Sequence, residues 1–114
     1  MGTVSRKIEP ELRTRKDIYA YDLLAWSLHK QGRNAEAAHA MTLAMKEGTQ
    51  DAQLFFHAGM IEHALGHNDA ARTQLTRALQ VNGYFHPTQP ALARATLAEL
   101  APVRRVATSA NTAR

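Results

Sequence analysis

The sequence contains one 34-residue segment in two copies, and this repeat constrains the fold more than any other feature. Shifting the chain by 34 residues aligns apolar with apolar, small with small and glycine with glycine across residues 18–85. The aligned pairs are Tyr21 with Phe55, Leu24 with Ala58, Ala25 with Gly59, Gly32 with Gly66, Ala37 with Ala71, Met41 with Leu75 and Ala44 with Ala78. A fixed period of this length is typical of stacked supersecondary units.

Each copy predicts two helices joined by a glycine turn. Asp17 and Asp51 precede the first helix of their copies, where an aspartate side chain can accept hydrogen bonds from free backbone N–H groups. Gly32 and Gly66 follow these helices, and glycine ends a helix at little cost because it readily adopts left-handed backbone angles. The four expected helices cover residues 18–31, 34–47, 52–65 and 68–81.

A fifth helix is expected after the second copy. Thr88 is a suitable N-cap residue, and Pro90 would then occupy the first turn, where proline is tolerated. Pro102 limits this helix, which we expect to end near residue 100. Because no sixth helix pairs with it, the element is predicted to cap the second copy.

Basic residues gather at the two ends of the chain. Residues 1–16 hold five basic and two acidic side chains, residues 17–101 hold six and eight, and residues 102–114 hold three and none. The segment charges of +3, −2 and +3 sum to the +4 of the whole chain. Because the expected folded part is slightly acidic, it is not expected to attract nucleic acid. Composition predicts a disordered tail at 102–114 and, at 1–16, a partly disordered segment or a remnant helix.

The order of large and small residues in each copy resembles the tetratricopeptide repeat family, whose unit is a 34-residue helix–turn–helix. Small residues at Ala25 and Gly59, the glycine turns and the alanines of the second helices match that pattern, whereas Tyr21 and Phe55 replace its usual tryptophan. The resemblance implies an all-α fold, a right-handed superhelix of antiparallel helix pairs (an α-solenoid). It places a domain at residues 17–101, with repeats at 18–51 and 52–85 and a capping helix at 88–100.

The small residues also carry a packing prediction. Ala25 and Gly59 should let the second helix of each copy approach the first closely. Larger apolar side chains are expected to fill the space beside them, namely Leu24, Leu28, Met41 and Leu75.

In the family, the first helices of successive repeats line a concave groove that holds peptide segments. Carried over by the repeat register, the resemblance implies a groove centred on Trp26, Phe56 and Met60. The full set of implied binding residues is Tyr19, Asp22, Trp26, His29, Gln53, Phe56, His57, Met60, His63 and Arg94. The alternative is that residues 5–16 fold back over Tyr19 and Trp26 and cover them.

No residue pattern predicts catalysis, a cofactor or a metal centre. The chain lacks cysteine, which excludes thiolate ligands and cysteine nucleophiles, and it has no glycine-rich phosphate loop. His63 and His67 lie four residues apart, but Gly66 interrupts the helix between them and a metal centre needs three or four ligands. Partial protonation of His29, His57 and His63 at about pH 6.5 would make binding at the groove sensitive to pH.

These features predict a non-enzymatic cytoplasmic scaffold that binds a protein or peptide. No apolar run reaches the length of a signal-peptide core or a membrane span. Repeat stacks need about three units, whereas this chain offers two and a cap. Either the N-terminal segment or another copy of the chain then seals the open end, so a self-associating homo-oligomer is one alternative function. A nucleic-acid-associated accessory protein that binds through its basic tails is another.

Overall fold

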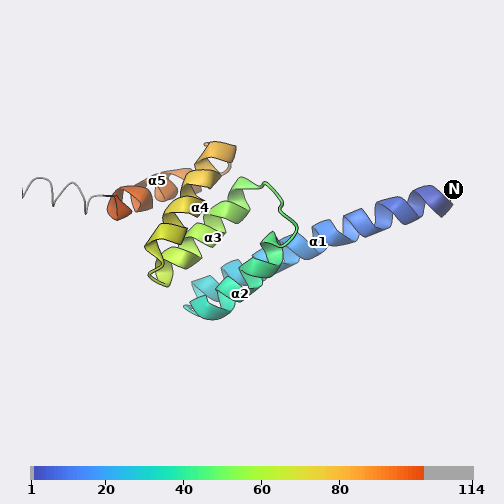
Figure 1. Ribbon diagram of the computed structural model, residues 1–114, viewed down its shortest axis with the longest axis horizontal. Helices are drawn as coiled ribbons and strands as arrows, with labels where there is room; N and C mark the ends of the chain where they lie inside the picture. Colours follow the sequence, from blue (N-terminus) through green and yellow to red (C-terminus); the bar gives the residue numbers. More distant parts are fainter. Residues whose placement is uncertain (1, 102–114) are drawn as a thin grey trace, which may run out of the picture. The chain divides into compact units, whose positions relative to one another are not determined.

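The computed structural model describes residues 2–101, with side chains from Arg13 to Ala101. Every regular element in this part of the chain is an α-helix, as predicted (Figure 1). The chain divides between Gln50 and Asp51 into two units. The first unit contains α1 (Gly2–Lys30) and α2 (Asn34–Met45), and the second contains α3 (Ala52–Ala64), α4 (Asn68–Val81) and α5 (Gln89–Leu100). The tail expected at residues 102–114 lies outside the described residues.

The two glycine turns have the same geometry, which confirms their predicted role. Gly32 has a φ of 80° and Gly66 a φ of 81°. In the first turn, the Arg33 N–H donates to Leu28 O at 2.9 Å and the Gly32 N–H donates to His29 O at 2.9 Å. The second turn repeats both bonds 34 residues later, at 2.9 and 3.0 Å. This pair of bonds is the Schellman motif, which satisfies the last carbonyl groups of a helix and reverses the chain.

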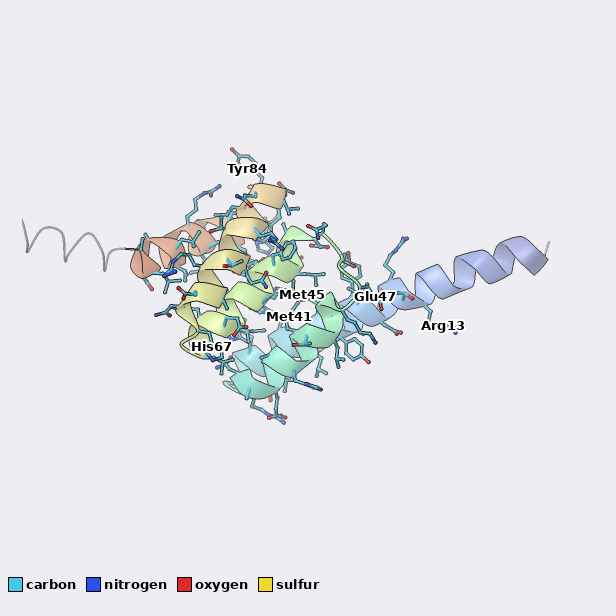
Figure 2. The ribbon with its side chains drawn as sticks, viewed as in Figure 1. Arg13, Met41, Met45, Glu47, His67 and Tyr84 are labelled. Carbon is cyan, nitrogen blue, oxygen red and sulfur yellow. The ribbon has the colours of Figure 1, made fainter. Side chains whose placement is uncertain are left out.

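Small residues hold the paired helices close together within each unit. The structure places α1 against α2, and α3 against α4. Each pair buries its predicted small side chains completely, at Ala25, Ala37 and Ala44 in the first unit and at Ala71 and Ala78 in the second. Met41, which lies on α2 in Figure 2, and its counterpart Leu75 are also buried. Leu24 differs from its prediction, because it remains exposed instead of filling the core.

The helix boundaries agree with the sequence prediction for most of the chain. The Asp51 side chain accepts a hydrogen bond from the Gln53 N–H at 2.8 Å, which confirms Asp51 as the N-cap of α3. Helix α4 has the predicted bounds, while α2 ends two residues and α3 one residue before the expected positions. In the second unit, α5 contacts both α4 and α3, as expected for a cap.

The start of α1 differs from the prediction. The helix begins at Gly2 and runs without interruption to Lys30, so Asp17 lies inside a helix and does not cap one. The segment 11–16 is rich in glutamate, leucine, arginine and lysine, which favour a helix and carry it past Asp17. Residues 5–16 therefore extend the axis of α1 and do not fold back over Tyr19 and Trp26. At 1.5 Å per residue, the 29 residues of α1 span about 44 Å, against about 18 Å for the 12 residues of α2.

A histidine side chain caps α5. His86 Nδ1 accepts hydrogen bonds from the backbone N–H groups of Thr88 and Gln89, with N···N distances of 3.1 and 3.3 Å. The Thr88 side chain, which the sequence predicts as the cap, makes no capping hydrogen bond. Pro90 occupies the first turn of α5, as predicted. His86 thus supplies the acceptor that the start of α5 needs.

We expect His86→Ala to destabilise the protein by about 1 kcal/mol, the usual cost of removing an N-cap acceptor. His86→Asn is the matched control, because the asparagine Oδ1 branches from the same carbon as Nδ1 and can accept the same bonds. Urea unfolding of the full chain, followed by circular dichroism, measures both effects. If His86→Ala unfolded at the same urea concentration as the unsubstituted protein, the imidazole would not stabilise the start of α5.

Within residues 2–101, no helix is long and apolar enough to cross a membrane.

Candidate interaction surface on the first unit

Two residues of the predicted groove, Phe56 and His57, are core residues of the second unit. Phe56 is 0% exposed and His57 is 4% exposed. The Phe56 ring lies 5.6 Å from the Phe85 ring and 5.9 Å from the His57 ring, centroid to centroid. A side chain without accessible surface cannot anchor a ligand. The prediction that Phe56 and His57 line a ligand groove is therefore wrong.

Gln53 and Met60, also predicted to bind a ligand, hold α5 in place. The Gln53 side-chain amide donates to Gln89 Oε1 at 3.3 Å, which joins α3 to the first residue of α5. About two turns further along the same two helices, the Thr96 hydroxyl donates to the Met60 sulfur at 3.8 Å. These side chains thus have a structural role inside the second unit.

The two remaining residues predicted in the second unit also contact their own unit. His63 Nε2 lies 4.0 Å from a Glu99 carboxylate oxygen, and this pair becomes an ion pair only when the imidazole is protonated. The Arg94 guanidinium donates to the Gly83 carbonyl oxygen at 3.3 Å. Both Glu99 and Arg94 belong to α5, so the second unit's share of the predicted groove is mainly the packing surface of this helix.

In the first unit, the structure brings the four predicted residues to neighbouring turns of α1 and gives them different surroundings. Tyr19 is exposed, Asp22 is buried, and Trp26 and His29 are half-buried. The Trp26 ring lies 4.8 Å from the His29 ring, and Lys30 Nζ lies 5.2 Å from the Trp26 centroid. His29 Nδ1 is 2.7 Å from Asn34 Oδ1, which ties the ring to the start of α2. The indole is therefore held along the helix surface.

Three further apolar residues of α1 are exposed, and the sequence prediction missed them as binding residues. They are Tyr21, Leu23 and Leu24. Together with Tyr19 they make up four of the seven large hydrophobic side chains that are exposed among the described side chains. The sequence contains a signal for this exposure, because almost every residue from 18 to 28 is apolar. One buried face of a helix cannot cover so many apolar residues, so some of them must remain exposed.

The second copy of the repeat buries the positions that the first copy exposes. Tyr21 is 38% exposed, and its counterpart Phe55 is 3% exposed. For Leu24 and its counterpart Ala58 the fractions are 49% and 6%. Leu23 is 71% exposed, whereas the residue 34 positions later, His57, is buried. The first unit thus leaves exposed three apolar positions whose counterparts in the second unit are buried.

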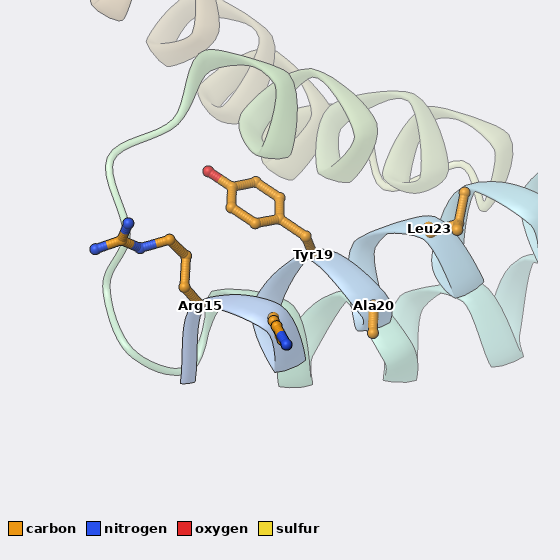
Figure 3. A pocket seen from close by; sticks show the side chains of 5 residues that line it. Arg15, Tyr19, Ala20 and Leu23 are labelled. Atoms are coloured by element: carbon orange, nitrogen blue, oxygen red, sulfur yellow. The ribbon is translucent and has the colours of Figure 1, made fainter. Parts of the chain in front are cut away.

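Two hollows lie beside these exposed side chains, on different sides of α1. The first has a volume of about 450 Å³ and runs along α1, where Figure 3 shows it; its lining residues are Arg15, Lys16, Tyr19, Ala20 and Leu23. The second, of about 430 Å³, lies between α1 and α2 and is lined by Leu24, Leu28, Ala35, Glu36, His39, Ala40 and Leu43. Both are mainly apolar. The first includes the predicted binding residue Tyr19, whereas the second contains none of the predicted binding residues.

An ion pair frames the second hollow. The Arg33 guanidinium donates two hydrogen bonds to the Glu36 carboxylate, at 2.8 and 2.6 Å. The hydrogen bond from Arg33 lowers the pKa of Glu36, and the same bond raises the pKa of Arg33. Both charges are exposed, so solvent screens their interaction and its effect on stability is small. Its main effect is local, since it fixes the Glu36 side chain at the rim of the hollow.

His63 on α3 and His67 in the turn that follows it have separate carboxylate neighbours. His67 Nδ1 lies 2.7 Å from a Glu62 oxygen, whereas His63 lies near Glu99. Among the described side chains, Arg13 to Ala101, no three histidine, aspartate or glutamate residues form a group that could hold a metal ion.

Comparisons with models of protein families, with curated proteins and with solved structures found no match for this chain. Inferences about its function therefore rest on its own residues and on their geometry.

Proposed function

We propose that the protein is a non-enzymatic protein-interaction module and that α1 of the first unit is its docking element. One observation carries this proposal: the first copy of the hairpin exposes Tyr21, Leu23 and Leu24, while the second copy buries the matching positions. Exposed apolar side chains that cluster on one element commonly mark a contact surface. Leu23 lies on one side of α1 and Tyr21 and Leu24 on another, so a partner helix or peptide laid on Leu23 would cover the first of these sides.

The composition of the surface also favours a protein ligand. Tyrosine and leucine side chains supply apolar area, and aromatic side chains often anchor protein interfaces. Hollows of about 430 and 450 Å³ beside these side chains provide room for inserted residues. Tyr19 and Leu23 line one hollow and Leu24 lines the other, and these side chains lie on different sides of α1, so a partner helix would use one of the two hollows.

We propose further that the two hairpins are units of the tetratricopeptide repeat type and stack as a solenoid. The 34-residue register and the repeated Schellman turns support this assignment. The buried small residues at matching positions of both copies support it as well. In repeat architectures each unit buries its faces on its neighbours, so an apolar face that no neighbouring unit covers is available to a partner.

A photo-cross-linking amino acid at position 23 tests the docking role of α1. We expect Leu23→benzoylphenylalanine, made in the full chain in the cells that produce it, to form a covalent adduct with a partner protein on irradiation. The control carries the same group in place of Tyr84, which is 90% exposed in the second unit and projects beyond α4 in Figure 2. No adduct at position 23, or identical adducts at both positions, would contradict the proposal.

The adduct also separates the alternative functions. A product of twice the 12.6 kDa chain mass would identify the partner as a second copy, and would support self-association. A product that nuclease treatment removes would instead support the nucleic-acid-associated alternative.

A further inference from the structure

Five residues of α1 form a continuous stripe, which we call the α1 stripe. Their spacings of four, four, three and four residues place them on one side of the helix, and they are Arg15, Tyr19, Leu23, Trp26 and Lys30. Tyr19 and Leu23 are exposed, and the half-buried Trp26 ring continues the apolar surface toward Lys30. At 1.5 Å per residue the two ends of the stripe are about 22 Å apart.

The charges of the α1 stripe are positive at both ends. Arg15 and its exposed neighbour Lys16 border the hollow at one end, and the exposed Lys30 stands at the other. Asp22, the acidic residue beside the centre of the stripe, is only 9% exposed. By helical spacing, Asp17 falls on the opposite side of α1 from Tyr19 and Leu23. The stripe therefore combines an apolar centre with cationic ends.

We infer that the α1 stripe binds an amphipathic helix that has an apolar centre and acidic side chains at both ends. This inference rests on the proposed function and specifies the chemistry of the partner. Acidic groups about 22 Å apart would meet Arg15 with Lys16 at one end and Lys30 at the other. Acidic groups at the centre are disfavoured, because they would lose water against Tyr19 and Leu23.

Nucleic acid fits this stripe poorly. A nucleic acid carries closely and evenly spaced phosphates, and its affinity grows with the number of phosphates that cations neutralise. Here the cations stand at two ends about 22 Å apart, so phosphates along the centre of the stripe would face tyrosine, leucine and tryptophan. An anionic protein helix can leave its centre uncharged, which a phosphate backbone cannot do.

A display library of 20-residue helical peptides, randomised on one face, tests the inference on the full chain. We expect selection to enrich acidic residues at both ends of that face and apolar residues between them. Enrichment of peptides without this pattern would overturn the inference while leaving the docking role of α1, which the cross-link at position 23 tests separately. Selection of no peptide would overturn it too, as would tighter binding of a 20-nucleotide single strand than of the best peptide.

Charge variants then test the residues themselves. The double variant Arg15→Gln with Lys30→Gln removes two exposed ion pairs between the protein and acidic residues of the selected peptide. It should weaken binding of that peptide by about two- to twentyfold at low salt. The effect should shrink in about 0.5 M salt, where exposed charges are screened. Arg13→Gln with Lys46→Gln is the matched control, because it removes the same charge from exposed positions off the stripe. An equal loss of affinity in the two variants would show that only net charge matters and would overturn the inference.

Discussion

Replacing Phe56 with alanine should destabilise the protein by about 3–5 kcal/mol, the usual cost of truncating a buried phenylalanine. Phe56 is fully buried on α3, and its ring packs on Phe85 in the segment that leads to α5. The substitution removes that contact and leaves a cavity that the surrounding helices can close only in part. Urea unfolding of the full chain, followed by circular dichroism, measures the loss.

The control for this experiment is Tyr19→Ala, which truncates an aromatic side chain that is exposed on α1. A substitution at an exposed position should change stability by no more than about 0.5 kcal/mol. Similar losses for the two variants would contradict the placement of Phe56 in a core. The contrast also bears on function, because loss of binding in a Phe56 variant would report unfolding, whereas Tyr19 and Leu23 variants test a surface.

Gly59→Leu should destabilise the second unit by about 1–3 kcal/mol through overpacking. A Cβ atom built at position 59 would lie 2.6 Å from both Cγ and Cδ2 of Leu75 and 3.1 Å from its backbone nitrogen. A leucine there must push α4 away from α3 or displace Leu75 from a fully buried position. Thermal unfolding followed by circular dichroism should show a lower melting temperature.

Ala64→Leu is the matched control for Gly59→Leu, since it adds a leucine to an exposed position of the same helix. A second variant checks the mechanism: Leu75→Ala removes the atoms nearest to the new side chain, so Gly59→Leu should cost less in that background. If Gly59→Leu melts at the temperature of the unsubstituted protein, α3 and α4 do not meet at this residue pair.

Local signals predicted the helices and turns well. Gly32 and Gly66 need a left-handed conformation that few other residues adopt, and Asp51 offers a cap acceptor directly before a helix. Such signals depend only on neighbours in the chain. The predicted start of α1 was wrong because Asp17 is also tolerated within a helix, where the favourable residues before it decide the outcome. The role of His86 was missed because its acceptor follows from a turn geometry that composition does not specify.

Exposure was harder to predict than helix position. Leu54, Phe55, Phe56 and His57 are consecutive in α3, and all four are buried. Four consecutive positions of a helix point to more than one side, so this apolar run offers no polar stripe from which the exposed face can be recognised. The repeat register placed Phe56 on a ligand groove by analogy, whereas in the structure its ring packs on Phe85. Which apolar side chains of α1 remain uncovered follows only from the number of helices packed around it.

The short glycine turns have a consequence for how the chain folds. Three residues connect α1 to α2, and three connect α3 to α4, so the closest contacts join residues near in sequence; Gly59 and Leu75 are 16 positions apart. Closing so short a loop costs little chain entropy, and proteins built from local contacts fold fast, commonly within microseconds to milliseconds. A partner would therefore meet α1 as a preformed helix, and its association rate should be set by diffusion and orientation and not by the folding of this protein.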